Sequence, residues 1–144
     1  MNKRRTWKFS GLFIAFLLLV LWRQFGPGLP VDVTRRHDEI AAAFTDQRSG
    51  LMLEFDARVL RILTEAAPES PQQRFVVELD NGHVLLVVHD LERAAAVPLA
   101  PYDLVRIRGE YQWNEQGGEV HWTHRDPGFG LKHGWIEHKG KRYD

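Results

Sequence analysis

Alternation of apolar and polar residues predicts five β-strands between positions 53 and 123. In residues 53–59 apolar side chains alternate with charged ones, the period of a half-buried strand. The phase slips at Val59-Leu60 before Ile62 resumes it, which predicts a β-bulge in a long, bent strand. The four later strands are expected over residues 75–79, 84–88, 105–113 and 119–123.

The segments between these strands carry turn and helix signals. Asp80-Asn81-Gly82 has the residue types of a tight type I′ hairpin turn. Asp90 is a suitable N-cap for a helix over residues 91–97, which the prolines at 98 and 101 would end. An amphipathic helix is also predicted over residues 37–48, ahead of the first strand.

Three strands, a helix and two more strands, with a long bent first strand, follow the element order of the OB-fold. The sequence therefore predicts a mainly β protein: an OB-fold-like five-stranded small barrel with one helix between strands 3 and 4. A small up-and-down barrel and an SH3-like barrel are the alternatives. We expect residues 37–144 to form this domain, including a C-terminal tail rich in His and Trp.

An uncharged, mostly apolar run covers residues 9–22 and follows a basic stretch over residues 2–8. As a helix the run spans only ~21 Å, less than the ~30 Å hydrocarbon core, but snorkelling Lys8 and Arg23 and interfacial tryptophans extend its reach. No small-residue cleavage site follows it. We predict that residues 1–25 are a transmembrane signal anchor and residues 26–36 a linker. A cleaved signal peptide and a soluble core helix are the alternatives.

Charge around the apolar run predicts the topology. The positive-inside rule keeps residues 1–8 in the cytoplasm and sends the rest across the membrane. We therefore expect a single-pass protein of the bacterial inner membrane, bound to it through residues 7–25, with a periplasmic C-terminal domain. The chain has no cysteine, which excludes disulfides, a thiol nucleophile and thiolate metal sites.

The net charge of zero is the sum of a basic N-terminal segment and an acidic remainder. Residues 1–36 hold seven basic residues and one acidic residue, so the remainder of the chain has six more acidic than basic residues. An acidic domain repels polyphosphate at long range, which makes nucleic acid an unlikely partner. A small ligand or an envelope protein is the expected partner.

Four of the seven histidines lie between positions 121 and 138. One interpretation is a divalent metal site, because imidazole and carboxylate groups are the usual ligands in a Cys-free protein. The candidate ligands are His121, His124, Asp126, His133 and His138. Strand geometry argues partly against this site, because His121 and His124 would point to opposite faces. The alternative is a hydrogen-bonded lattice of His, Trp and Asp that fixes the tail to the barrel.

OB-folds commonly bind ligands through strands 2 and 3 and through the loops after strands 1 and 4. The candidate ligand-binding residues are Arg74, His89, Trp113, His121 and Trp122. Each has a structural alternative, because the tryptophans are equally suited to the core and the arginine to a solvated ion pair.

The string Gly-Gly-x-x-His-Trp-Thr-His-x-Asp-Pro over residues 117–127 resembles a family of small bacterial envelope proteins. These have a leading signal or anchor segment and no assigned function, and the similarity covers about residues 38–143. The chain departs from the pattern at Gln72, where histidine is common, and at Asp90, where asparagine is common. The resemblance implies an envelope OB-like module and no catalytic residues.

A looser likeness is to the periplasmic haem chaperone of cytochrome c maturation, which also carries a C-terminal His and Tyr. Here His138 and Tyr143 are five residues apart, one more than in that family. This likeness implies haem or metal handling in the envelope as a lesser alternative.

No nucleophile elbow, phosphate-binding glycine loop or dinucleotide fingerprint is present. We therefore predict a non-catalytic, membrane-anchored, periplasm-facing OB-like binding module of unknown ligand, without a cofactor. The main alternative is a metal-dependent hydrolase, in which an ion held by the His/Asp cluster activates water. A purely structural tether is the third possibility.

Overall fold

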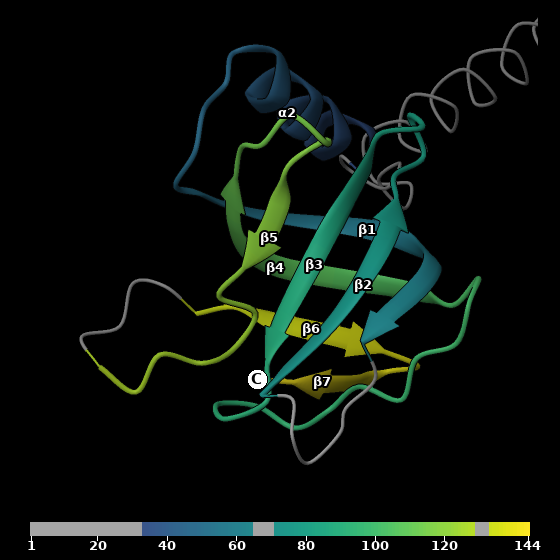
Figure 1. Ribbon diagram of the computed structural model, residues 1–144, viewed down its shortest axis with the longest axis vertical. Helices are drawn as coiled ribbons and strands as arrows, with labels where there is room; N and C mark the ends of the chain where they lie inside the picture. Colours follow the sequence, from purple (N-terminus) through teal and green to yellow (C-terminus); the bar gives the residue numbers. More distant parts are fainter. Residues whose placement is uncertain (1–32, 65–70, 129–132) are drawn as a thin grey trace, which may run out of the picture. The chain divides into compact units, whose positions relative to one another are not determined.

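The computed structural model describes residues 33–64, 71–128 and 133–144, and within them five strands close into a barrel (Figure 1). The strands are β1 (Leu51–Thr64), β2 (Gln72–Glu78), β3 (Val84–Asp90), β4 (Leu104–Gln112) and β5 (Glu119–His121). Their order is β1-β2-β3-β5-β4, and β4 pairs with β1 to close the ring. All neighbours are antiparallel except β3 and β5, which are parallel. The predicted mainly β, five-stranded barrel is confirmed.

Period-2 alternation places one face of each strand inside the barrel. The buried apolar side chains include Phe55, Val59, Phe75, Val87 and Ile107. The predicted bulge in β1 is confirmed by a register shift between Val59 and Arg61, and a second shift follows between Ile62 and Thr64. These shifts bend β1, so its first half pairs with β4 and its second half with β2.

Two further strands, β6 (Trp135–His138) and β7 (Lys141–Tyr143), form a hairpin that continues the sheet beyond β4 (Figure 1). One edge of β4 is therefore shared, with residues 110–112 pairing with β5 and residues 105–108 with β6. Lys139 and Gly140 connect the hairpin with φ of 50° and 76°, as a type I′ turn requires. The predicted His- and Trp-rich tail is thus partly a hairpin of the main sheet.

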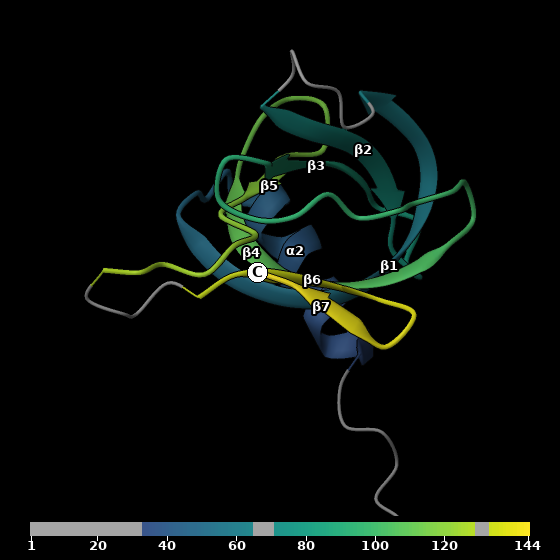
Figure 2. The same ribbon diagram turned by 90° about the horizontal axis from the view of Figure 1, so that it is seen from below.

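Helix α2 (Val33–Thr45) lies at the end of the barrel opposite the β6–β7 hairpin (Figures 1 and 2). It begins and ends earlier than the predicted helix over residues 37–48. Ile40 and Ala43 are fully buried in the core. The imidazole of His37 donates from Nε2 to the carbonyl of Asp56 at 2.8 Å, and Asn81 Nδ2 donates to the carbonyl of His37 at 3.1 Å. These contacts fix the helix to β1 and to the β2–β3 turn.

The predicted helix between strands 3 and 4 is wrong. Residues 91–94 form a single turn after the Asp90 cap, and residues 95–100 have no regular structure. The reason is that side chains of the barrel bind this segment's backbone. Gln73 donates to the carbonyl of Val97 at 2.7 Å and accepts from its N–H at 3.0 Å, while His89 binds the carbonyl of Ala95. These bonds occupy backbone groups that a helix would need for its own hydrogen bonds.

The turn at Asp80-Asn81-Gly82 joins β2 to β3 as predicted, but it is not type I′. Only Gly82 has a positive φ, 81°, whereas type I′ requires two such residues. Leu79 N–H binds the carbonyl of His83 at 2.9 Å, which closes a three-residue loop.

The predicted signal anchor over residues 1–25 and the first part of the predicted linker, residues 26–32, lie outside the described residues. The rest of the predicted linker, residues 33–36, is the first turn of α2. In the parts of the chain that are described, no helix has the length and apolar character needed to cross a membrane.

Candidate functional site

The outer side of β2, β3 and β5 carries an apolar centre with charged side chains around it. The cross-strand neighbours on this side are Arg74 with Val88, Val76 with Leu86, and Leu86 with Glu119. We call this surface, made by Arg74, Val76, Val84, Leu86, Val88, Glu119 and His121, the β2–β3–β5 face. Arg61 of β1 borders it, because it pairs with Val76.

Two of the five predicted ligand-binding residues lie on the β2–β3–β5 face, and a third adjoins it. Arg74 is exposed there. His121 points to the same side, because Val120 before it faces the barrel interior. Its Nε2–H donates to Glu119 Oε1 at 2.9 Å, and its side chain is 43% exposed. Trp122 follows directly with a φ of 53°, so the chain turns sharply away from β5 at this point.

His89 points into the barrel and is fully buried. Its Nε2 must carry the proton, because it binds the Ala95 carbonyl at 3.0 Å and a carbonyl only accepts. Nδ1 then accepts from the Thr123 hydroxyl at 2.8 Å. Burial is the main cause that lowers the pKa of His89, and the nearby His124 lowers it further. These bonds tie the end of β5 and the 91–100 segment to β3; ligand binding by His89 stays a prediction.

Trp113 lies by α2, away from the β2–β3–β5 face. Its indole Nε1–H donates to the carbonyl of Phe44 at 3.1 Å, and its backbone N–H donates to Ser49 Oγ at 2.9 Å. The side chain is partly buried against the core. These contacts match its structural alternative, and a ligand-binding role stays a prediction.

The predicted metal ligands lie apart in the described structure. His121 binds Glu119, and Asp126 Oδ1 accepts from the Gly128 N–H at 2.9 Å. His138 Nε2–H donates to Asp103 Oδ2 at 2.8 Å, while His133 is exposed. Across the described segments, no three His, Asp or Glu side chains come close enough together to hold a metal ion. Metal binding by these residues stays a prediction.

His124 differs from the other histidines of this cluster. The residue is 4% exposed, and neither ring nitrogen has a hydrogen-bond partner within the described parts of the chain. Its ring lies against the indole of Trp122, with centroids 5.0 Å apart. Burial is the main cause that lowers its pKa, and the positive charge of Arg93 lowers it further, against weaker opposite effects of Asp90 and Asp126. A buried, neutral imidazole with both nitrogens unused is free to accept a bond from a ligand.

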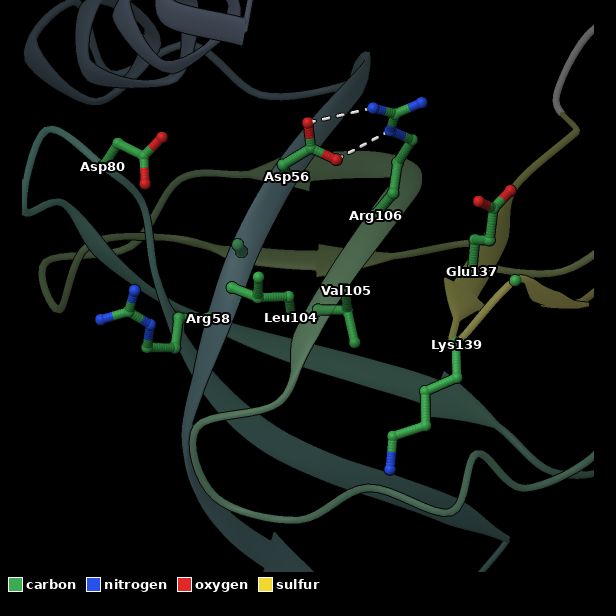
Figure 3. A pocket seen from close by; sticks show the side chains of 10 residues that line it. Asp56, Arg58, Asp80, Leu104, Val105, Arg106, Glu137 and Lys139 are labelled. Atoms are coloured by element: carbon green, nitrogen blue, oxygen red, sulfur yellow. Dashed lines mark hydrogen bonds and ion pairs between the residues drawn. The ribbon is translucent and has the colours of Figure 1, made fainter.

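A groove of about 580 Å³ lies on the outer side of β1, β4 and β6 (Figure 3). Arg106 lines it and binds both carboxylate oxygens of Asp56, at 2.7 and 3.2 Å. Leu104 lies in its centre and is 69% exposed. The residue pattern of the sequence did not predict this groove. The one indication in the sequence is Leu104, an apolar residue that points to the opposite side of its strand from Val105 and Ile107.

Residues 29–144 match a family described as "Protein of unknown function (DUF3465)". None of the curated proteins compared with the chain matches it.

Proposed function

Because the chain belongs to the DUF3465 family, whose function is unknown, the function has to be inferred from its surfaces. We propose that the barrel is a non-catalytic binding module that takes its ligand on the β2–β3–β5 face. The observation that carries this proposal is the position of Arg74 and His121 on either side of β3, beside the half-buried Leu86; Val88, between them, is buried.

The strand arrangement supports an OB-type module. A closed order β1-β2-β3-β5-β4 with a long, doubly bulged β1 is what a five-stranded Greek-key barrel needs. In OB-folds the face of strands 2 and 3 is the usual ligand surface. The missing helix between β3 and β4 does not alter this face, because residues 95–97 bind side chains that point into the barrel.

The proposal also includes the subcellular location of the protein. The basic residues 2–8 and the apolar run 9–22 favour an inner-membrane anchor with the barrel in the periplasm. The ligand is then an envelope protein or a small molecule of that compartment, and the acidic domain disfavours nucleic acid.

Site-specific photocrosslinking in cells tests the proposal without knowledge of the ligand. We expect a photoreactive amino acid at Leu86 to give a discrete adduct, and Arg74→Glu to reduce that adduct at least tenfold. The control position is Glu39, which is exposed on α2 at one end of the barrel. The same adduct at both positions, or no adduct at Leu86, would exclude this face as the binding surface.

One observation favours the metal-dependent hydrolase as a second candidate. Within the described segments the ring nitrogens of His124 have no partner, which gives this residue the free donor atom that a metal ligand needs. Elemental analysis of the full-length protein, purified without a His-tag, is the measurement. Stoichiometric zinc or manganese that is lost on His124→Ala supports the enzyme. Metal-free protein whose melting is unchanged by chelator excludes it.

A further inference from the structure

Two arginines on the outer side of β1 and β2 have no partner within the described segments. Arg61 and Arg74 are both exposed, and neither side chain forms a hydrogen bond or an ion pair there. Seven other arginines each have a carboxylate oxygen within 3.8 Å, namely Arg36, Arg48, Arg93, Arg106, Arg108, Arg125 and Arg142. A shortage of acids is not the cause, because residues 37–144 hold six more acidic than basic residues.

The strand register places the two arginines close together on neighbouring strands (Figure 1). Arg61 pairs with Val76, and Arg74 lies two positions before Val76 on the same side of β2. Such diagonal neighbours in an antiparallel pair have their Cβ atoms roughly 7 Å apart. Two positive charges at this distance repel each other, so an anion bound beside them is stabilised by both.

The positions directly opposite the two arginines are not acidic. Arg61 lies opposite Val76, and Arg74 lies between Thr64 on β1 and Val88 on β3. Neither arginine is therefore offered a carboxylate by the strand beside it. Their charges are available to a partner.

Arg58 provides a comparison on the same strand. It is exposed and has no ion pair within the described part of the chain, but its cross-strand neighbour on β2 is Glu78. Opposite charges at such positions attract each other. Arg58 is therefore excluded from the candidate site and serves as its control.

The exposure of both guanidinium groups indicates the kind of anion. An ion pair in full contact with water contributes little free energy, so a small free anion would be held weakly. A partner protein that also covers the half-buried Leu86, beside Val76, would exclude water from the ion pairs and strengthen them. An anionic membrane surface fits less well, because its field acts on the whole acidic domain and repels it.

The spacing of the arginines matches an extended segment. Residues two positions apart on a strand point to the same side and are about 7 Å apart. Two carboxylates with this spacing can each meet one of the two guanidinium groups, and arginine is well suited to bind carboxylates with two parallel hydrogen bonds.

We propose that Arg61 and Arg74 dock an extended acidic segment of a partner protein, in which Asp or Glu residues lie two positions apart. This inference rests on the proposed ligand binding by the β2–β3–β5 face, and it names the chemistry of the partner.

Charge reversal at Arg61, combined with photocrosslinking of the full-length chain from position 86 in cells, is the first test. We expect Arg61→Glu to reduce the adduct at least about tenfold, and Arg58→Glu to leave it within about twofold of the native yield. An adduct that is unchanged by Arg61→Glu overturns the acidic partner but leaves ligand binding by the face standing. Equal losses in both variants also overturn it, because they would reflect only the net charge of the domain. Absence of any adduct overturns both proposals.

Mass spectrometry of the native adduct is the second test. We expect the crosslinked peptide to contain two acidic residues two positions apart. Their replacement by lysine in the partner should restore the adduct to the double variant Arg61→Glu, Arg74→Glu, which also shows that this variant is folded. A lipid adduct, a peptide without such acids, or a charge exchange that restores no adduct overturns the proposal.

Discussion

Gly134→Ala is expected to destabilise the protein by about 3 kcal/mol or more, a large part of the stability of a small domain. A Cβ on Gly134 would lie 1.7 Å from the carbonyl oxygen of Trp122 and 2.9 Å from that of Arg108. Both are backbone atoms, so no side chain can rotate away. The chain would have to separate β6 from β4 and break the bond from the Gly134 N–H to the His124 carbonyl, now 2.9 Å.

Urea unfolding followed by circular dichroism measures this loss, with Gly128→Ala as the matched control. Among the described residues, the nearest atoms to a Cβ on Gly128 belong to the carboxylate of Asp126, at 3.1 Å, and that side chain can move. We expect the control to unfold within about 1 kcal/mol of the native protein. Equal midpoints for Gly134→Ala and the native protein would contradict the close crossing of residues 122 and 134.

Acidification below pH 6.5 is expected to destabilise the fold by up to about 1.4 kcal/mol per pH unit for each of two histidines. Burial lowers the pKa of His89 and of His124 below the ordinary value of 6.5. Between the lowered pKa and 6.5 the unfolded chain binds more protons than the folded protein, so the free energy of unfolding falls as the pH falls. Above pH 6.5 both states are neutral at these residues and the effect is absent.

The variant His124→Leu isolates one of the two histidines. It removes two buried nitrogens that have no partner among the described residues, so we expect it to be about 1 kcal/mol more stable than the native protein at pH 7.5. Between pH 6.5 and 5.5 its free energy of unfolding should also fall less steeply with pH. The difference in slope is the contribution of the one proton that His124 no longer binds in the unfolded chain. Thermal unfolding at steps of half a pH unit gives both values. A slope identical to the native one would mean that His124 is not held neutral by burial.

The sequence predicted the strands of the barrel because their apolar residues face one core. The alternation over residues 53–59 and its slip at Val59-Leu60 gave β1 with its bulge. The helix over residues 91–97 was predicted from a cap and two prolines, which are local signals. The structure depends instead on Gln73 and His89, whose side chains reach this segment from β2 and β3. No local pattern shows such bonds.

The site could be predicted only in part, for a related reason. The residue types at Arg74 and His121 indicated a binding surface, and the strand register places them around Leu86 and Val88. The β6–β7 hairpin was missed because strands of four and three residues are too short to show alternation. Because β6 was not predicted, nothing in the sequence placed Glu137 and Lys139 beside Leu104. The side of the groove that β6 forms could therefore not be predicted.

The position of β7 at the end of the sheet has a consequence for solubility. A terminal strand presents unpaired backbone groups, on which another chain can add and start aggregation. β7 has only three residues, and two of them, Lys141 and Arg142, are charged and exposed. Arg142 also covers the ring of Trp135, with its guanidinium carbon 4.0 Å from the ring centroid, and so shields the largest apolar side chain of the hairpin. A short basic edge of this kind discourages fibrous stacking at high local concentration.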